Sequence, residues 1–259
     1  MFQTAVLASG SKGNAILVRT KSAKILIDVG LSGKQVFAAM EALHLDTQRI
    51  DGIILSHEHS DHLRGCGILC RKLKIPLYAS YDTYCVAQHK IGKLPVGVQH
   101  FKHGCDFTIK DIVIHPFASS HDAVDSSNFT LQNGGEKRLG VITDTGFVTN
   151  LLELKTRDCT TLILESNHDD DLLMNGPYPW HLKQRIRGRL GHLSNLQAVG
   201  LISKVIHPQL KNLILAHLSE VNNTPEVAAE TMRGFLDTIR HNARLIIAGQ
   251  YKPTEIIDI

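Results

Sequence analysis

The sequence predicts an α/β protein in which layers of helices cover β-sheets. Short apolar runs of strand length alternate with single helix-like stretches along most of the 259 residues, and this alternation is typical of layered α/β folds. Hydrophobic residues make up 43% of the chain and charged residues 20%, which is ordinary for a globular protein with a substantial core. We therefore expect a single domain over residues 1–259 that contains two similar αβ halves.

The first predicted half is rich in strands. Its first two strands are joined by LASGSKGN at residues 7–14, whose glycines permit a hairpin turn. Ser11 in this turn is also a candidate contact for a phosphate group of a substrate. The elements predicted in this half are strands at 4–9, 15–20, 23–29, 50–56, 75–80 and 111–117, with helices near 33–43 and directly after His62.

The second predicted half alternates strands with longer helices. Ser194 and Gln197 fit a capping box at the start of one helix. Pro225, which follows Asn223 and Thr224, suits the first position of another. The elements predicted here are strands at 129–132, 137–144, 159–166, 210–217 and 244–250, with helices at about 195–206 and 225–241.

Residues 56–62 read SHEHSDH and are the most informative stretch of the chain. They bring three imidazoles and a carboxylate together directly after an apolar strand-like run, through His57, His59, Asp61 and His62. Imidazole nitrogen and carboxylate oxygen are the ligands that suit zinc, manganese or iron. A solvated polar loop is the alternative, but four such ligands at this spacing favour a metal site, and they are enough to serve two metals.

Further potential ligands follow other predicted strands. Asp28 closes AKILI, His121 follows DIVIHPFASS, Asp144 follows RLGVIT, and His217 follows LKNLILA. Scattered core histidines would not all stand at strand ends. We therefore expect these side chains to converge on the SHEHSDH loop.

Composition excludes several classes of protein. The five cysteines are odd in number and lack a CxxC spacing, so no disulfide framework is expected. Cys66 and Cys70, one helical turn apart, are interpreted as core residues of the helix after the metal loop. The N-terminus lacks the pattern of a secretory signal, and no apolar run approaches the ~20 residues of a membrane span. A cytoplasmic protein without membrane contact is expected.

A net charge of +3 is too small to indicate a polyanionic partner, but the distribution of charge is more informative. The stretch WHLKQRIRGRLGH at 180–192 concentrates Lys183, Arg185, Arg187 and Arg189, and it is either a solvated face or a phosphate-binding surface.

The helix start that follows this basic stretch adds weight to phosphate binding. A helix N-terminus offers free N–H groups to an anion, so Ser194 and Asn195 are candidate substrate contacts, although they can also serve only as caps. Asn223, which follows His217 in HLSEVNN, is a similar candidate with the same structural alternative.

These motifs resemble the metallo-β-lactamase superfamily, whose fold is a four-layer αβ/βα sandwich. HxHxDH followed by His, Asp and His at later strand ends carries that resemblance. A narrower resemblance, to the exonuclease-like YycJ/WalJ branch, extends from residue 3 to about 250. It rests on LASGSKGN, ESNHD at 165–169, GPYP at 176–179, GHLSN at 191–195 and HLSEVNN at 217–223.

The resemblance implies a ligand set for two divalent metal ions, zinc or manganese, with iron as a further option. Carried over position by position, the ligands are His57, His59 and His121 for one ion, Asp61, His62 and His217 for the other, and Asp144 bridging both. Asp28 would orient the HxHxDH loop through hydrogen bonds, as residues behind metal ligands generally do.

The implied activity is a metal-dependent phosphodiesterase, a DNA exonuclease whose metal-bridging hydroxide attacks phosphorus. Asp61 and Asp144 would hold the nucleophile and accept its proton. His192 and His168 are the candidates for the acid that protonates the leaving oxygen, and His192 could instead donate to a phosphate or support the loop. The expected partner is nucleic acid, with DNA favoured over RNA.

Three other functions share the metal motif: a thioesterase of the glyoxalase II kind, an RNA-directed nuclease, and a non-catalytic metal-binding regulator. The GHLSN and HLSxxNN segments favour the exonuclease branch over the thioesterase, and the complete ligand set disfavours the regulator. Ribonuclease J-like enzymes insert a large domain between the bridging Asp and the last His. The short stretch between Asp144 and His217 leaves no room for it.

Overall fold

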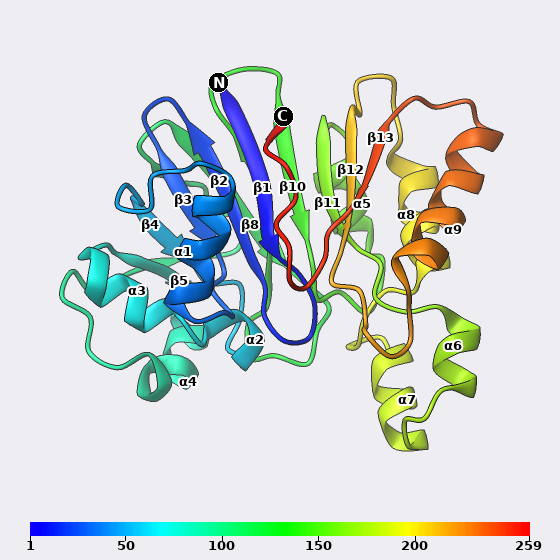
Figure 1. Cartoon of the computed structure of the whole chain (residues 1–259), viewed down its shortest axis with the longest axis horizontal. Coiled ribbons are helices and arrows are strands. Elements are labelled where there is room, and N and C mark those ends of the chain that lie inside the picture. Colours follow the sequence, from blue (N-terminus) through cyan, green and yellow to red (C-terminus); the bar gives the residue numbers. More distant parts are fainter.

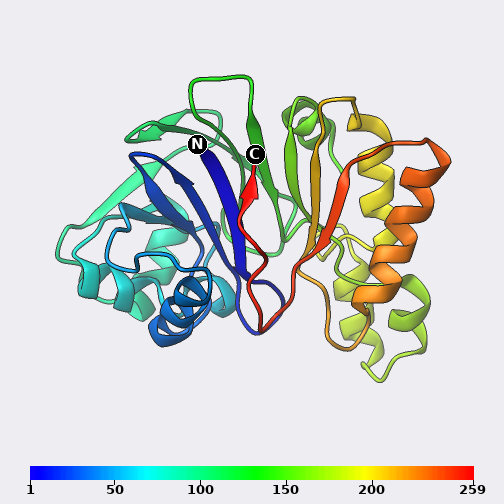
Figure 2. The ribbon, with the colours of Figure 1, turned by 45° about the horizontal axis from the view of Figure 1, so that its top comes forward.

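Two seven-stranded β-sheets pack face to face, and helices cover the outer side of each sheet (Figure 1, Figure 2). The computed structural model describes residues 1–259. The arrangement is the four-layer αβ/βα sandwich expected from the sequence. The turned view in Figure 2 places the helices of the first half on one flank and those of the second half on the other.

The first sheet combines an antiparallel meander at one edge with a parallel set at the other. Its strands, in order across the sheet, are β14 (Ile257–Asp258), β1 (Phe2–Ala8), β2 (Ala15–Thr20), β3 (Lys24–Ile27), β4 (Gly52–Ile54), β5 (Leu77–Ser80) and β6 (Val98–Phe101). Strands β1 to β3 are antiparallel, which confirms the hairpin at 7–14, and β3 to β6 are parallel. The helices of this half are α1 (Gly33–Ala42), α2 (Ser60–Leu63), α3 (Cys66–Leu73) and α4 (Tyr81–Ile91).

The second sheet repeats this plan. Its strands, in order, are β13 (Arg244–Ile247), β12 (Asn212–Ala216), β11 (Thr161–Glu165), β10 (Arg138–Ile142), β9 (Ser127–Gln132), β8 (Ile112–Ala118) and β7 (Phe107–Ile109). Strands β7 to β10 are antiparallel and β10 to β13 are parallel. The helices are α5 (Asn150–Thr156), α6 (Asp170–Asn175), α7 (Trp180–Arg187), α8 (Asn195–Val205) and α9 (Pro225–Thr238).

Three apolar clusters hold the four layers together. Along each strand, successive side chains point to opposite faces, so Ile54 enters the cluster between the sheets while Ile53 packs against the helices of the first half. Ile214 and Leu213 divide in the same way in the second half. Burying each such side chain contributes about 1.5–3 kcal/mol. Both sheets are therefore fixed from two sides, and their strand ends form a rigid base for a site.

The structure confirms the helices predicted near 33–43, 195–206 and 225–241, which are α1, α8 and α9. It also contains elements that the pattern did not reveal, namely α4, β6, β7, α5, α6, α7 and the two-residue strand β14. Helix α7 was missed because none of its residues is buried, so it carries no clear apolar stripe.

Even the longest helix, α9, has only 14 residues, and the structure contains no helix with the length and apolar character needed to cross a membrane.

Candidate metal centre

Parallel strands of both sheets deliver polar side chains to one end of the molecule. Asp28, His57, Asp144, Glu165 and His217 follow or close β3, β4, β10, β11 and β12. Three of these residues have left-handed backbones, with φ of 60° at Asp28, 53° at Asp144 and 56° at His217. This conformation is uncommon outside glycine and costs about 1–3 kcal/mol. The surrounding fold holds strained backbone at the strand ends, where functional sites often lie.

The HxHxDH loop leaves β4 and turns at once into α2, which begins after His59. A close backbone contact fixes this turn, because a Cβ atom on Gly30 would lie 1.5 Å from the carbonyl oxygen of Asp61. Asn14 secures the same point from the first hairpin. Its backbone N–H donates to that carbonyl over 2.8 Å, and its side chain lies 3.3 Å from Oδ2 of Asp61.

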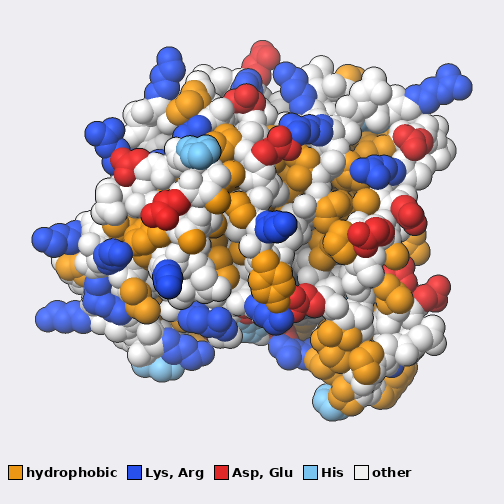
Figure 3. Space-filling model, viewed as in Figure 1, with side chains coloured by type: hydrophobic (Ala, Val, Ile, Leu, Met, Phe, Trp, Pro, Cys, Tyr) orange, Lys and Arg blue, Asp and Glu red, His pale blue; other side chains and the backbone are white.

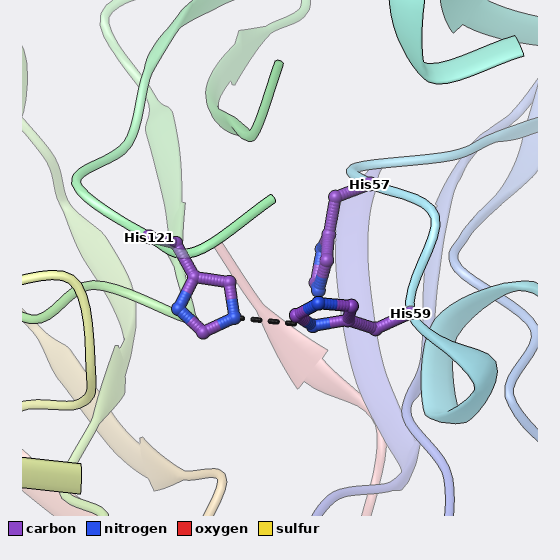
Figure 4. A group of neighbouring side chains, drawn as sticks. All are labelled: His57, His59 and His121. Carbon is purple, nitrogen blue, oxygen red and sulfur yellow. Dashed lines mark hydrogen bonds between the residues drawn. The ribbon is translucent and has the colours of Figure 1, made fainter. Parts of the chain in front are cut away.

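Three imidazoles form the first group at the strand ends (Figure 4). His57, His59 and His121 each offer one ring nitrogen within 4.8 Å of the others. Nε2 of His121 lies 3.3 Å from Nδ1 of His59, and Nδ1 of His121 lies 3.1 Å from the carbonyl oxygen of Gly191. The structure thus brings together residues from both halves of the molecule.

Asp61, His62 and His217 form the second group, again within 4.8 Å of one another. Oδ2 of Asp61 lies 3.4 Å from Nε2 of His62 and 3.6 Å from Nε2 of His217. Asp144 lies between the two groups. Its Oδ2 is 3.2 Å from Nε2 of His62, and its Oδ1 is 3.6 Å from Nε2 of His121.

A buried carboxylate supports the second group from the first half. Oδ2 of Asp28 lies 2.8 Å from Nδ1 of His62 and also accepts the hydroxyl of Ser56, while Oδ1 accepts the N–H of Ser56. Because a carboxylate only accepts, Nδ1 of His62 must carry the proton, which leaves the lone pair on Nε2 for a metal ion.

Glu165 is a second buried carboxylate that supports the site, and it belongs to the second half of the molecule. Its Oε1 lies 2.8 Å from Nδ1 of His192 and 2.8 Å from Nδ1 of His217. Its Oε2 accepts the N–H groups of Thr145 and Leu193, each over 3.0 Å. The sequence interpretation missed this role, although Glu165 closes the apolar run CTTLIL in the same way that Asp28 closes AKILI.

The buried carboxylates concentrate negative charge at the site. Burial would raise the pKa of Asp144, but the nearby imidazoles of His217 and His62 outweigh burial and hold it well below its usual range. Burial also opposes ionisation of Glu165, yet His192 and His217 lower its pKa to about 2. Both carboxylates are therefore ionised at neutral pH, as cation ligands must be.

In the first group of imidazoles, the pKa shifts favour the neutral form of the ring. Burial lowers the pKa of His57 and of His121, so these rings are neutral near pH 7 and keep a lone pair for a metal.

The donor atoms fit divalent cations. Nε2 of His57 and Nε2 of His217 are buried and have no hydrogen-bond partner, although buried polar atoms are normally paired. Both belong to the clusters described above, where imidazole nitrogens and ionised carboxylates face one another. This combination suits zinc, manganese or iron.

The clusters open into a cavity of about 430 Å³ whose lining contains no hydrophobic residue. Asp61, Asp144 and His192 line it, together with Ser11 and Arg185. Nε of Arg185 donates to Asp122 over 2.6 Å, and the side chain remains 62% exposed. A cation that is oriented in this way at the cavity edge suits an anionic substrate.

The structure places three predicted substrate contacts inside the scaffold instead of in this lining. Ser194 caps α8 in the expected capping box, and Asn195 and Asn223 are buried and bonded to each other. The N–H of Asn195 donates to the carbonyl of His168, and the N–H of Gln197 to the hydroxyl of Ser194. These amides of the helix start are therefore already paired within the protein, and Ser11 alone of the four predicted contacts lines the cavity.

The residues of the basic stretch 180–192 lie in different surroundings. Only Arg185 lines the cavity. Arg187 lies 3.9 Å from Asp170, and Arg189 stacks on the ring of Phe147 at 4.0 Å. His168, the second candidate for a proton donor, is fully buried and does not line the cavity.

Comparison with known proteins gives a consistent result. Residues 23–218 match the family model described as a beta-lactamase superfamily domain. The chain is 39% identical over 233 residues to exodeoxyribonuclease YycJ of Bacillus anthracis, which covers 90% of this chain and 88% of that protein. It is 36% identical over 234 residues to exodeoxyribonuclease WalJ of Streptococcus pneumoniae serotype 2, covering 89% of this chain and 87% of that one.

Among solved structures, Zn²⁺-bound PqqB from Methylobacterium extorquens matches with a TM-score of 0.73 and 14% identity over 99% of this chain and 100% of that chain. A likeness at this low identity concerns the fold alone.

Proposed function

Because the chain belongs to the metallo-β-lactamase superfamily, in the branch of the exodeoxyribonucleases YycJ and WalJ, we propose that it is a metal-dependent phosphodiesterase that removes nucleotides from DNA ends. Residues 1–259 would act as one hydrolase domain. The observation that carries the proposal is the cavity at the strand ends, which combines convergent imidazoles and carboxylates with an exposed arginine and no apolar lining.

Two divalent ions, zinc or manganese with iron as an option, are proposed for this site. The first would be held by His57, His59 and His121, the second by Asp61, His62 and His217, and Asp144 would contact both. The grouping of these ring and carboxylate atoms within 4.8 Å supports the assignment. Such ions would supply Lewis acidity, which activates water near neutral pH and offsets charge on phosphorus.

The surrounding side chains have separate roles in the proposal. Asp61, which is partly exposed in the cavity, and Asp144 would accept the proton of the attacking water. The Nδ1–H of His192 donates a hydrogen bond to Glu165, which leaves Nε2 as the nitrogen available to the substrate. With Nε2 protonated, His192 would donate to the leaving oxygen or to a phosphate oxygen. Arg185 and Ser11 would position the phosphate from the cavity edge.

Degradation of end-labelled nucleic acids tests this function. Protein stripped of metal and reconstituted with Mn²⁺, Zn²⁺ or Mg²⁺ is incubated with single- and double-stranded DNA and RNA. We expect mononucleotides to appear from DNA ends and Asp144→Asn, which preserves the shape of the side chain, to be inactive. Internal cleavage products would contradict an exonuclease. Inert nucleic acids together with hydrolysis of S-lactoylglutathione would replace the nuclease with a thioesterase.

Metal analysis tests the ion count separately. The wild-type protein should bind close to two ions per chain, and occupancy should fall in His59→Ala and Asp144→Ala while circular dichroism stays unchanged. Saturation at one ion in the wild-type protein would refute the two-ion site without affecting the assignment of the reaction.

A further inference from the structure

A second hollow opens beside the metal cavity, and its lining differs in kind. It has a volume of about 260 Å³ and shares Ser11, Arg185 and His192 with the metal cavity. Unlike that cavity, it has apolar walls, formed by Tyr178, Leu182 and Ile186. The two spaces are therefore contiguous, and a substrate bound at the metal site has an apolar surface within reach.

Helix α7 builds this wall. Tyr178, Leu182 and Ile186 are four residues apart and lie along one face of the helix and its entry. All three are only partly buried, and α7 has no buried residue at all. In Figure 1 the α6–α7 region stands below the second sheet, on the side where α2 carries the metal loop. The apolar face of α7 thus remains available to a ligand.

We propose that this hollow is a base subsite, which receives the terminal nucleobase of the strand while the adjoining phosphate occupies the metal cavity. This inference rests on the proposed nuclease function. A nucleobase offers flat faces that stack on an aromatic ring whatever its identity, so the ring of Tyr178 would bind it without selecting a sequence. The role of the GPYP motif at 176–179 would then be to position Tyr178.

The charges at the boundary match this arrangement. Arg185 lines both spaces, and Asp122 fixes its orientation through the 2.6 Å bond from Nε. The rest of its guanidinium group is exposed and can donate to a phosphate that joins the base subsite to the metal cavity. The terminal nucleotide would thereby be held by its base, its phosphate and the metal site together.

The opposite face of α7 supplies a matched control. Trp180 is 59% exposed and, with Met174, Lys183 and Arg187, lines a separate hollow that shares no residue with the metal cavity. Figure 3 shows a group of hydrophobic side chains at the free end of the α6–α7 region. Substituting Trp180 removes a large aromatic side chain from the same helix without touching the base subsite.

The test uses single-stranded DNA whose terminal nucleotide is either normal or abasic, with each end modified in turn. Single-turnover release of that nucleotide is measured with manganese-loaded protein. We expect the wild type to release the normal nucleotide about 10-fold faster or more, as loss of one base stack implies. In Tyr178→Ala this rate advantage should disappear, because only the normal substrate is slowed. Leu182→Ala should reduce the advantage. The variants Tyr178→Phe and Trp180→Ala should retain the advantage.

Two results would overturn the base subsite. One is equal rates for the two substrates in the wild type. The other is a Tyr178→Ala variant, with unchanged metal content and melting temperature, that slows both substrates equally, because the residue would then act only on the site as a whole. Failure of the proposed function gives a different result: the wild type would cleave neither substrate, and the base subsite would fall with it.

Discussion

Asp28 and Glu165 are buried carboxylates at the ends of parallel strands in the two halves, yet they serve different parts of the site. Asp28 follows β3 in the first sheet and Glu165 closes β11 in the second. Each accepts a hydrogen bond from an imidazole Nδ1 and at least one from a backbone N–H group. In each half a buried acid thus fixes the tautomer of a histidine that is proposed to bind metal.

The difference lies in what each acid connects. Asp28 joins His62 to Ser56 within the HxHxDH loop. Glu165 joins His217, a proposed ligand, to His192, which is proposed to act on the substrate. We infer that Asp28 supports metal binding alone, whereas Glu165 couples metal binding to proton donation.

Glu165→Gln is expected to have the largest effect. The amide oxygen can still accept the backbone N–H groups of Thr145 and Leu193, but its NH₂ group would face Nδ1 of His217 and His192. Both rings would then turn to the tautomer with hydrogen on Nε2, which cannot bind metal. Combined losses in metal affinity and in proton donation predict a fall in activity of about 10³-fold or more. Metal titration and nuclease rates measure the two components.

Excess metal should fail to restore Glu165→Gln, because the amide cannot accept the Nδ1–H that His192 must keep when it gives up the proton on Nε2. Full recovery of activity at high metal concentration would show that Glu165 acts on the ligand only, and the contrast with Asp28 would disappear.

His192→Ala isolates the second role of Glu165. With His217 still bonded to Glu165, metal content should equal that of the wild type. The nuclease rate should fall by about 10²-fold, the usual size of the loss when a proton donor or an oxyanion contact is removed. A variant that also loses metal would place His192 among the residues that hold the metal site together.

Asp28→Asn is expected to have a smaller and reversible effect. The amide would turn His62 to the wrong tautomer, but His192 and Glu165 keep their bond. Metal affinity should drop by about 10–100-fold, and saturating metal should restore most of the nuclease rate. A low rate at full metal occupancy would mean that Asp28 also positions groups that act on the substrate.

The sequence predicted the fold, and it identified the strand-end histidines and carboxylates that the structure brings together, because these signals are local. Apolar runs with polar residues at their ends identify strands and what they deliver, and HxHxDH lies within a single loop. Asp28 was identified as supporting this loop, and the structure bonds it to His62 and Ser56. The chain path that brings His121 beside His59 is not visible in any one segment, although both were predicted from strand ends.

The residues proposed to contact the substrate could not be predicted in the same way. Ser194 and Asn195 have the chemistry for a phosphate, but packing buries them in the start of α8. Glu165 gave the same strand-end signal as Asp28, and its bonds to His192 and His217 depend on long-range packing. Tyr178 belongs to the GPYP segment that carried the resemblance, but the sequence did not show that it lines a hollow with Arg185, because this depends on where the fold places α7.

The smallest expected effect is a change in the rate of cysteine labelling, which reports on local opening in each half separately. Burial raises the pKa of the thiols of Cys70 and Cys159 to about 12, so at pH 8 both are protonated and react slowly, and their reactivity should increase as the pH rises toward 12. Exposed Cys85 and Cys105 serve as fast internal standards.

Cys70 lies on α3, the helix that follows the HxHxDH loop and α2, whereas Cys159 precedes β11. Asp28→Asn should loosen the loop by ~1 kcal/mol, so labelling of Cys70 should rise about five-fold while that of Cys159 stays constant. Mass spectrometry of the labelled peptides at pH 8 measures both rates. An equal increase at Cys159 would show that the two halves open together, and that Asp28 and Glu165 are not independent supports.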